Sequence, residues 1–229
     1  MPVKDRPLKE AIEKVIGNSR KGRKKVIPLV RRIYPDAGIS QIRRVYCQHG
    51  FALMKRMKKR TRNNPPNPAA VPLTANEEWA IDFMHDSLAN GRQIRSLNII
   101  DPFNRECKGI FIRHSFSGKS VIEALERAIE KHGKPKCIRS DNGPEFIAKK
   151  FQIWMDKNGI GWTRIQKGKP QQNCFVERFN KTVREDLLDA NLFLDLDHAN
   201  ELAQIFIDDY NNNRPHEALN NLTPLEYAA

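Results

Sequence analysis

The sequence predicts an α/β fold: a mixed five-stranded sheet with flanking helices, preceded by a small basic all-α segment. Three observations indicate this fold. Between residues 79 and 113, apolar and polar residues alternate in short runs that turn signals separate, as in an antiparallel meander. After residue 116, helical periodicity alternates with short strand-like runs, which gives the element order βββαβαβα. Before residue 63, apolar residues recur at helical spacing.

The N-terminal segment is expected to form short helices over residues 8–16, 26–34 and 40–48. His49-Gly50 then makes a turn, and residues 51–62 continue as a basic helix. Its candidate DNA-binding residues are Lys55, Arg56, Lys58, Lys59 and Arg60. A helix, a turn and a basic helix are typical of a helix-turn-helix that binds DNA. Simple packing of two helices joined at a glycine is the alternative.

The positive charge is concentrated in the first third of the chain. Residues 1–72 contain 19 Lys and Arg against 4 Asp and Glu, a net charge of +15, whereas the remaining residues carry 21 against 23, a net charge of −2. A basic segment joined to a near-neutral core predicts a polyphosphate partner, most simply DNA or RNA. A solubilising basic tail is the alternative.

Residues 63–72 read NNPPNPAAVP, with four prolines and no charge. Such a composition favours an extended, semi-rigid spacer. We therefore expect three regions: a helix-turn-helix-like DNA-binding segment over residues 1–62, a Pro-rich linker over 63–75 and a catalytic core over 76–229.

The elements of the core follow in order. Three strands are predicted over residues 79–84, 93–101 and 106–113, with short turns between them. A helix over 117–132, which Gly133 ends, begins the alternating part of the fold. It is followed by a strand over 137–141, a helix over 144–158, a strand over 161–165, a long helix over 171–190 and a final helix from residue 197.

Three carboxylates are predicted to meet in this core. Asp82 interrupts an apolar alternation, Asp141 ends a strand just before Asn-Gly, and Glu177 follows Asp141 after thirty-five intervening residues. Asp82 and Asp141 lie side by side if their strands are neighbours, and Glu177 can reach them from a helix that crosses the sheet edge. Asp101 also ends a strand, but the Pro-Phe-Asn after it indicates turn capping.

Converging carboxylates are suited to phosphoryl transfer between DNA strands. That reaction needs an activated attacking oxygen and a neutralised leaving oxygen, which two Mg²⁺ ions about 3.5 to 4 Å apart provide. Hard cations prefer oxygen ligands. Asp82, Asp141 and Glu177 are therefore predicted to be both catalytic residues and metal ligands, and Mn²⁺ is expected to substitute for Mg²⁺.

Basic residues beside the acids are candidate DNA contacts. Lys181 and Arg184 share the helix face of Glu177 and are predicted to lie along a phosphate backbone. Solvation of that face is the alternative. Lys167 and Lys169 belong to a Gly- and Pro-containing loop before the helix, which is a candidate clamp over DNA.

Other compositional signals argue against several classes of protein. The four cysteines lie far apart with no CxxC pair, so neither a zinc module nor a disulfide framework is indicated. No run of about 18 apolar residues occurs, and charges occupy the first twenty residues, where a signal peptide needs an apolar stretch. We expect a cytoplasmic protein that does not contact a membrane.

Five motifs carry a resemblance to a known family: WAIDFMHD, IRSLNIIDPFNRE, IRSDNGPEF, KGKPQQNCFVERFNKTVREDLL and YNNNRPHEALNNLTPLEYA. Together they resemble the integrase catalytic core of bacterial insertion-sequence transposases of the IS-three family, the product of the second reading frame. The resemblance covers about residues 77–229.

The resemblance implies an RNase H-like fold and Mg²⁺-dependent 3′ strand cleavage and strand transfer at element ends. It implies a catalytic triad of Asp82, Asp141 and Glu177, with Arg184 as a DNA contact. The implied partners are the terminal inverted repeats, target DNA and further copies of the chain on paired ends, in the bacterial cytoplasm at the nucleoid.

The first seventy residues depart from the family pattern. Where these proteins usually carry a Gly-Tyr-Arg-Arg stretch, the chain reads PDAGISQIRRVYCQHGF. In this family the main sequence-specific helix-turn-helix is usually encoded in the preceding frame, so an upstream-frame DNA-binding protein is a further expected partner.

Two other functions compete with an active transposase. One is an RNase H-class nuclease that hydrolyses DNA without strand transfer. The other is a non-catalytic DNA-binding regulator of transposition. Analysis of joined and nicked products separates the two enzymes, and an unchanged biological effect of Glu177→Gln favours the regulator.

Overall fold

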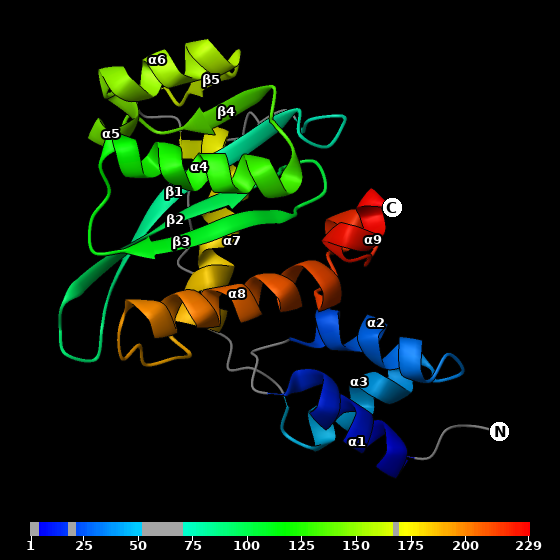
Figure 1. Ribbon diagram of the computed structural model, residues 1–229. Helices are drawn as coiled ribbons and strands as arrows, with labels where there is room; N and C mark the ends of the chain where they lie inside the picture. The colour runs from blue at the N-terminus through cyan, green and yellow to red at the C-terminus, as the bar shows by residue number, and fades with distance from the viewer. Residues whose placement is uncertain (1–4, 18–21, 52–70, 167–169) are drawn as a thin grey trace. The chain divides into compact units, whose positions relative to one another are not determined.

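The computed structural model describes residues 5–17, 22–51, 71–166 and 170–229 (Figure 1). The chain forms two compact units. The first consists of Met1–Asn64 and Arg214–Thr223, and the second of Pro65–Asn213 and Pro224–Ala229. None of the described helices is both long and apolar enough to cross a membrane.

The first unit contains three short amphipathic helices, α1 (Asp5–Ile16), α2 (Arg23–Ile33) and α3 (Ile39–Gln48), and a 3-10 turn, η3 (Glu217–Leu219). The three helices turn their apolar stripes towards a common core that contains Leu8, Ile12, Val26, Val30, Ile42 and Val45. The helices predicted over 8–16, 26–34 and 40–48 are confirmed to within a few residues. The predicted helix over 51–62 lies, from residue 52 onward, outside the described residues, together with its five candidate DNA-binding residues.

The second unit is built on a five-stranded mixed sheet with the strand order β3-β2-β1-β4-β5. Its strands are β1 (Glu78–Ser87), β2 (Gln93–Ile100), β3 (Cys107–Arg113), β4 (Cys137–Ser140) and β5 (Gly161–Arg164). The first three strands pair antiparallel, whereas β4 pairs parallel with β1, and β5 pairs parallel with β4. The predicted α/β fold class is therefore confirmed.

Each face of the sheet is covered by its own group of helices, because alternate residues of a strand point to opposite faces. Trp79 and Ile81 of β1 pack with α4 (Gly118–His132), α5 (Pro144–Ile147) and α6 (Lys149–Asn158). Ala80 packs on the opposite face with α7 (Cys174–Val183) and α8 (Leu196–Asn213). Figure 1 shows α4 in front of the sheet and α7 behind it.

The helix expected over residues 144–158 is interrupted. Ala148 has φ −53° and ψ 129°, which is not helical, so the segment is divided into α5 and α6. The break lets Phe146 and Phe151 both reach the same core with their rings 5.7 Å apart. A single straight helix would place residues five positions apart on different faces.

The helix expected over residues 171–190 has three parts. A 3-10 turn, η1 (Pro170–Asn173), precedes α7, and a π-helical turn, η2 (Arg184–Leu188), follows it. In η2 the Asp189 N–H donates to the Arg184 carbonyl, five residues back. The wider turn buries the consecutive residues Leu187 and Leu188 in the core together.

The outer edge of β3 is covered by α8 instead of a sixth strand. The Asn211 side chain bonds to both the N–H and the carbonyl of Cys107, at 2.9 and 3.0 Å, and Asn200 bonds to both groups of Ile112 at 3.1 Å. Asn200 and Asn211 are three helical turns apart and so share one face of α8. Pairing these backbone groups protects an edge strand from association with another chain. A short helix, α9 (Pro224–Ala228), follows.

A buried ionic cluster lies at the start of β3. The Glu106 carboxylate accepts hydrogen bonds from Lys108 at 2.7 Å and Asn104 at 3.0 Å, and it lies 3.1 Å from His132 Nδ1. Burial alone would raise the pKa of Glu106, but the bonds from His132 and Lys108 outweigh burial and lower that pKa to about 2. The cluster joins β3 to the end of α4.

Candidate active site

Asp82 and Asp141 are brought together by the parallel pairing of β1 with β4. Glu78 lies opposite Cys137 and Ala80 lies opposite Arg139. Continuing this register by two residues places Asp82 opposite Asp141, just beyond the end of β4. The expectation that these two strands are neighbours is confirmed.

Glu177 approaches from the helix that covers this face. Asp82 shares its side of β1 with Ala80, which packs against α7. Val176, Phe179 and Val183 anchor α7 in the core, while Glu177 in the first turn of the helix is exposed.

The three carboxylates influence one another electrically. The pKa of Asp82 is raised to about 6, first by burial and then by the negative charges of Asp141 and Glu177. Hydrogen bonds from the Phe83 N–H at 2.9 Å and from the Asn180 amide at 2.8 Å act in the opposite direction. Asp82 is therefore harder to ionise than an ordinary aspartate.

The three acids supply only oxygen donors, which is the donor chemistry that Mg²⁺ and Mn²⁺ accept. Asp82 is half-buried, whereas Asp141 and Glu177 are exposed, and Asp141 Oδ1 accepts the Gly143 N–H at 3.0 Å. Among the described residues, no three His, Cys, Asp or Glu side chains are close enough to hold one ion as they stand. The carboxylate oxygens of the three acids are thus suitable ligands for Mg²⁺ or Mn²⁺, but the three side chains would have to move closer together to bind one ion.

Two asparagines near the acids were missed from the sequence. Asn180 lies one helical turn after Glu177, and its Nδ2 donates to Asp82 Oδ2 at 2.8 Å. Its Oδ1 accepts from Asn98 Nδ2 of β2 at 2.7 Å. The available signals were the i+3 spacing from Glu177 and the polar Asn98 within the otherwise apolar run LNII.

The other acidic residues in the neighbourhood have structural partners. Asp101 is fully buried and accepts the backbone N–H groups of Asn76 at 2.7 Å and Phe103 at 2.9 Å, so the predicted turn capping is confirmed. Asp86 forms an ion pair with Arg184. Glu145 forms an ion pair with Arg95.

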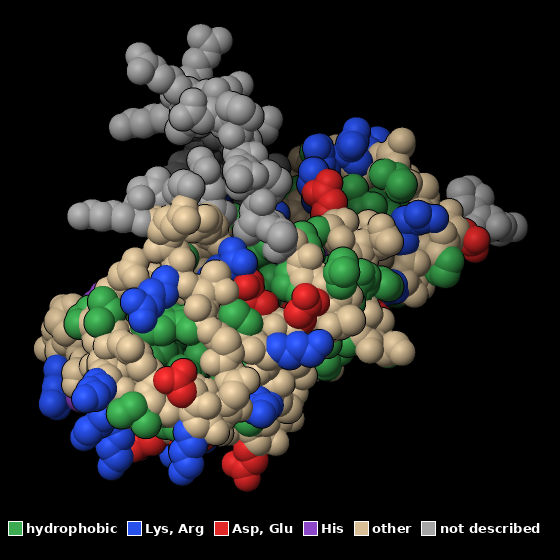
Figure 2. Space-filling model, turned by 90° about the horizontal axis from the view of Figure 1, so that it is seen from above, with side chains coloured by type: hydrophobic (Ala, Val, Ile, Leu, Met, Phe, Trp, Pro, Cys, Tyr) green, Lys and Arg blue, Asp and Glu red, His purple; other side chains and the backbone are tan. Residues whose placement is uncertain are grey.

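The candidate DNA contacts differ in their surroundings. The Lys181 side chain is 73% exposed, with Glu185 at 3.8 Å. Arg184 instead donates to the Asp86 carboxylate and to the His85 carbonyl, and so ties η2 to the end of β1. Lys167 and Lys169 lie outside the described residues. On the face shown in Figure 2, Lys and Arg side chains lie among Asp and Glu side chains.

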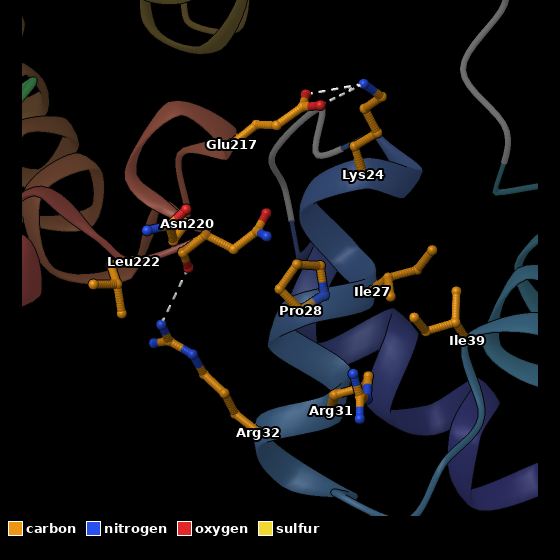
Figure 3. Close-up of a pocket in the computed structure, with 10 residues that line it drawn as sticks. Lys24, Ile27, Pro28, Arg31, Arg32, Ile39, Glu217, Asn220 and Leu222 are labelled. Atoms are coloured by element: carbon orange, nitrogen blue, oxygen red, sulfur yellow. Dashed lines mark hydrogen bonds and ion pairs between the residues drawn. The ribbon is translucent and has the colours of Figure 1, made fainter.

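A separate cavity of about 540 Å³ lies within the first unit (Figure 3). Ile27, Pro28 and Ile39 form part of its apolar lining, and Lys24 pairs with Glu217 at 2.9 Å on its rim. Because its one carboxylate is already paired, this cavity has no set of oxygen donors comparable to the acidic site.

The mixed five-stranded sheet with helices on both faces is the RNase H-like fold of integrase catalytic cores. The integrase core domain model matches residues 72–170, and a second integrase core domain model matches residues 158–224. The HTLV-2 integrase catalytic core in complex with magnesium has a TM-score of 0.56 and 23% identity, and the match covers 69% of this chain and 99% of that one. The simian T-cell lymphotropic virus intasome chain has a TM-score of 0.63 and 20% identity, over 95% of this chain and 74% of that one.

Two insertion-element proteins are more similar in sequence. A protein of insertion element IS407 from Burkholderia multivorans is 39% identical over 92% of this chain and 76% of its own length. A protein of insertion element IS476 from Xanthomonas euvesicatoria is 32% identical over 92% of this chain and 61% of its own length. The chain therefore belongs to the insertion-sequence transposases that carry an integrase catalytic core, a family of DNA transposition and integration proteins.

Proposed function

We propose that this chain performs 3′ strand cleavage and strand transfer at the ends of an insertion sequence, with Asp82, Asp141 and Glu177 as catalytic residues and ligands of two Mg²⁺ ions. The observation that supports this proposal is the parallel pairing of β1 with β4, because its register, continued by two residues, would bring Asp82 beside Asp141 on the side that α7 covers. Mn²⁺ should substitute, because it accepts the same oxygen donors.

Each carboxylate has a distinct part in the proposed site. Asp82 is fixed on a central strand and would provide the rigid ligand. Asp141 follows the end of β4, is more exposed than Asp82 and would provide a second ligand. Glu177 lies in the first turn of α7 with an exposed side chain and would provide the third ligand by a change of side-chain conformation. When bound, the two ions would activate the attacking oxygen and neutralise the leaving one.

The electrostatics favour closure of the site around a cation. The charges of Asp141 and Glu177 oppose ionisation of Asp82, and burial opposes it further. A divalent ion would reverse this balance, because an opposite charge stabilises all three carboxylates in their ionised form. We therefore propose that metal binding draws the three side chains together.

The proposed partners are the terminal inverted repeats and target DNA. We propose that Lys181, whose side chain is 73% exposed, contacts a phosphate, and that Arg184 does so after exchanging its partner Asp86. We extend the DNA-binding role to Lys167, Lys169 and the basic residues 55–60. We also propose that the chain acts as a homo-oligomer on paired element ends, in the cytoplasm at the nucleoid. An upstream-frame DNA-binding protein is a further proposed partner.

The test is a cleavage and joining assay on duplex DNA that carries the element's own ends, with Mg²⁺ or Mn²⁺. We expect metal-dependent joined products from the wild-type chain and none from Asp141→Asn or Glu177→Gln. Glu185→Gln is the matched control, because Glu185 is an acid only two helical turns from Glu177 with its side chain 47% exposed. It should retain joining.

The other outcomes select the competing functions. Metal-dependent nicks without joined strands would favour a nuclease. Binding of the ends without cleavage, also after fusion of the upstream frame, would favour a non-catalytic regulator. Equal joining by Asp141→Asn and the wild-type chain would refute the proposed site.

A further inference from the structure

Asn98 is a fully buried amide in the middle of the sheet. It lies directly opposite Asp82 in the antiparallel pairing of β1 with β2, so the two side chains share the sheet face that α7 covers. Its neighbours on that face of β2 include Ile94 and Ile100, which belong to the apolar core. Ser96, on the same face of β2, is also buried, so two polar side chains interrupt the apolar surface here.

The buried amide is only partly compensated. Asn98 Nδ2 donates to Asn180 Oδ1 at 2.7 Å, but Asn98 Oδ1 has no hydrogen-bond partner among the described residues. An unpaired buried acceptor costs about 1–3 kcal/mol. An apolar side chain would avoid that cost, so stability alone does not account for an asparagine here.

The direction of the hydrogen-bond chain is fixed by the carboxylate at its end. An ionised carboxylate only accepts hydrogen bonds, so Asn180 must turn its NH₂ group towards Asp82. Its carbonyl oxygen then faces Asn98, which must donate. The opposite orientation of the Asn180 amide would place two acceptors against each other. Asn98 thus selects the orientation of Asn180 that supports Asp82.

The chain of bonds also links the strand of one acid to the helix of another. Asn180 is one turn from Glu177 on α7, and it holds this part of the helix to β1 and β2 together. Asp82 Oδ1 accepts from Phe83 and Oδ2 accepts from Asn180. Because each carboxylate oxygen can accept two bonds, one position on each remains for a metal ion.

We propose that Asn98 is a positioning residue that sets the metal affinity of the acidic site by holding Asn180 against Asp82. The inference rests on the proposed function, since it concerns the same site. Asn98 itself is fully buried and bonds to Asn180, so it would act on the metal through Asn180 and Asp82. Partners of metal ligands commonly contribute about 10- to 100-fold to metal affinity.

The experiment measures Mn²⁺ binding to the purified full chain from the electron paramagnetic resonance signal of free Mn²⁺, without DNA. Asn98→Val removes the donor and should weaken Mn²⁺ binding about tenfold, near the lower end of the effect of such partners. Asp82→Asn, which removes a ligand, should weaken it more strongly. Thermal unfolding of each variant shows that it is folded.

Asn211→Val is the matched control. Asn211 is also a buried asparagine that bonds to the sheet, but it bonds to Cys107 at the edge of β3. Its removal should lower stability and leave Mn²⁺ affinity within about twofold of the wild-type value, because it supports no member of the acidic site. If Asn98→Val does not fold, Asn98→Ala, which also removes the donor and adds no larger group, is measured against the same criteria.

The outcomes separate the inference from the proposed function. If the wild-type chain binds Mn²⁺, Asp82→Asn loses binding and Asn98→Val binds as the wild type does, the positioning role is wrong and the metal site stands. The role is also wrong if Asn211→Val weakens binding as much as Asn98→Val does. If the wild-type chain shows no saturable binding, or Asp82→Asn binds equally well, the proposed metal site fails.

Discussion

Replacement of Asp82 by asparagine should stabilise the metal-free protein at neutral pH while removing its activity. The pKa of Asp82 is raised from its ordinary value of 3.8 to about 6, mainly by burial and then by Asp141 and Glu177. A raised pKa means that the folded state prefers the protonated form. Its stabilising contribution is complete below about pH 3.8 and is lost as the pH rises through 6.

The size of the effect follows from the pKa difference and from one hydrogen bond. The difference corresponds to about 3 kcal/mol, at about 1.4 kcal/mol per pH unit, and water around a half-buried group reduces it. An asparagine can accept from either Phe83 or Asn180 but not from both, which costs about 1 kcal/mol. We therefore expect a net gain of about 1–2 kcal/mol, or a rise in Tm of about 2–8 °C for a protein of this size.

Thermal and urea unfolding at pH 4, 6 and 8, with and without millimolar Mg²⁺, measure this gain. At pH 8 without metal, Asp82→Asn should be more stable than the wild type. At pH 4 the advantage should shrink towards zero, because the wild-type carboxyl is then largely protonated. Added Mg²⁺ should stabilise the wild type and have little effect on the variant.

Asp101→Asn is the matched control, since Asp101 is a buried carboxyl that caps a turn. Burial raises the pKa of Asp101 as well, so Asp101→Asn should also remove a buried charge, at the cost of a weakened cap, but added Mg²⁺ should stabilise it as much as it stabilises the wild type, because Asp101 is not one of the three proposed ligands. The reasoning is refuted if Asp82→Asn is less stable than the wild type at pH 8 without metal, or if the difference between them does not change with pH.

Three further predictions concern other side chains of the second unit. Glu106→Gln should cost about 3–5 kcal/mol of unfolding free energy at pH 7, because it breaks a buried charged cluster. The pKa of Glu106 is lowered from 4.5 to about 2, so the contribution of its ionised form to the unfolding free energy is present above pH 4.5 and lost as the pH falls through 2. A loss of stability in Glu106→Gln that is the same at pH 2 as at pH 7 would contradict this. Asn211→Val should lower the unfolding free energy measured with urea by about 1–3 kcal/mol, through the loss of two hydrogen bonds to the edge of β3. An unchanged urea midpoint would show that these two bonds do not stabilise the edge strand. Lys181→Ala should leave stability unchanged and reduce the salt slope of DNA binding by about one, whereas Arg184→Ala should lower stability by about 1–2 kcal/mol. Equal stability of the two variants would mean that the bonds of Arg184 contribute nothing to the fold.

Much of the fold was predictable because its signals are local. The alternation around Asp82, the helical stripe of Val176, Phe179 and Val183, and the turn after Asp101 each occupy a few consecutive residues. Strand and helix periods are read within such windows. Both helices were predicted, but their interruptions were not. The break at Ala148 and the π turn after Val183 serve packing against residues that are distant in the sequence.

The relation of the acids to their partners was less accessible to sequence reasoning. Asn98 and Asn180 are 82 residues apart, and Asn180 is 98 residues from Asp82. No local pattern connects such positions. Arg184 shows the same limit: helical spacing places it on the face of Glu177, but the π turn and its ion pair with Asp86 decide where its guanidinium lies.

The sequence by itself determined the order of the elements, and it singled out Asp82, Asp141 and Glu177 as candidate acids whose oxygen donors suit a divalent cation. Only the tertiary structure decided that β4 lies beside β1 in the register that aligns Asp82 with Asp141, and that α7 covers the face where they meet. The physical reason is that periodicity is set by neighbours in the chain, whereas the burial and electrostatic field that raise the pKa of Asp82 come from segments far along the chain that exclude water and bring charges near.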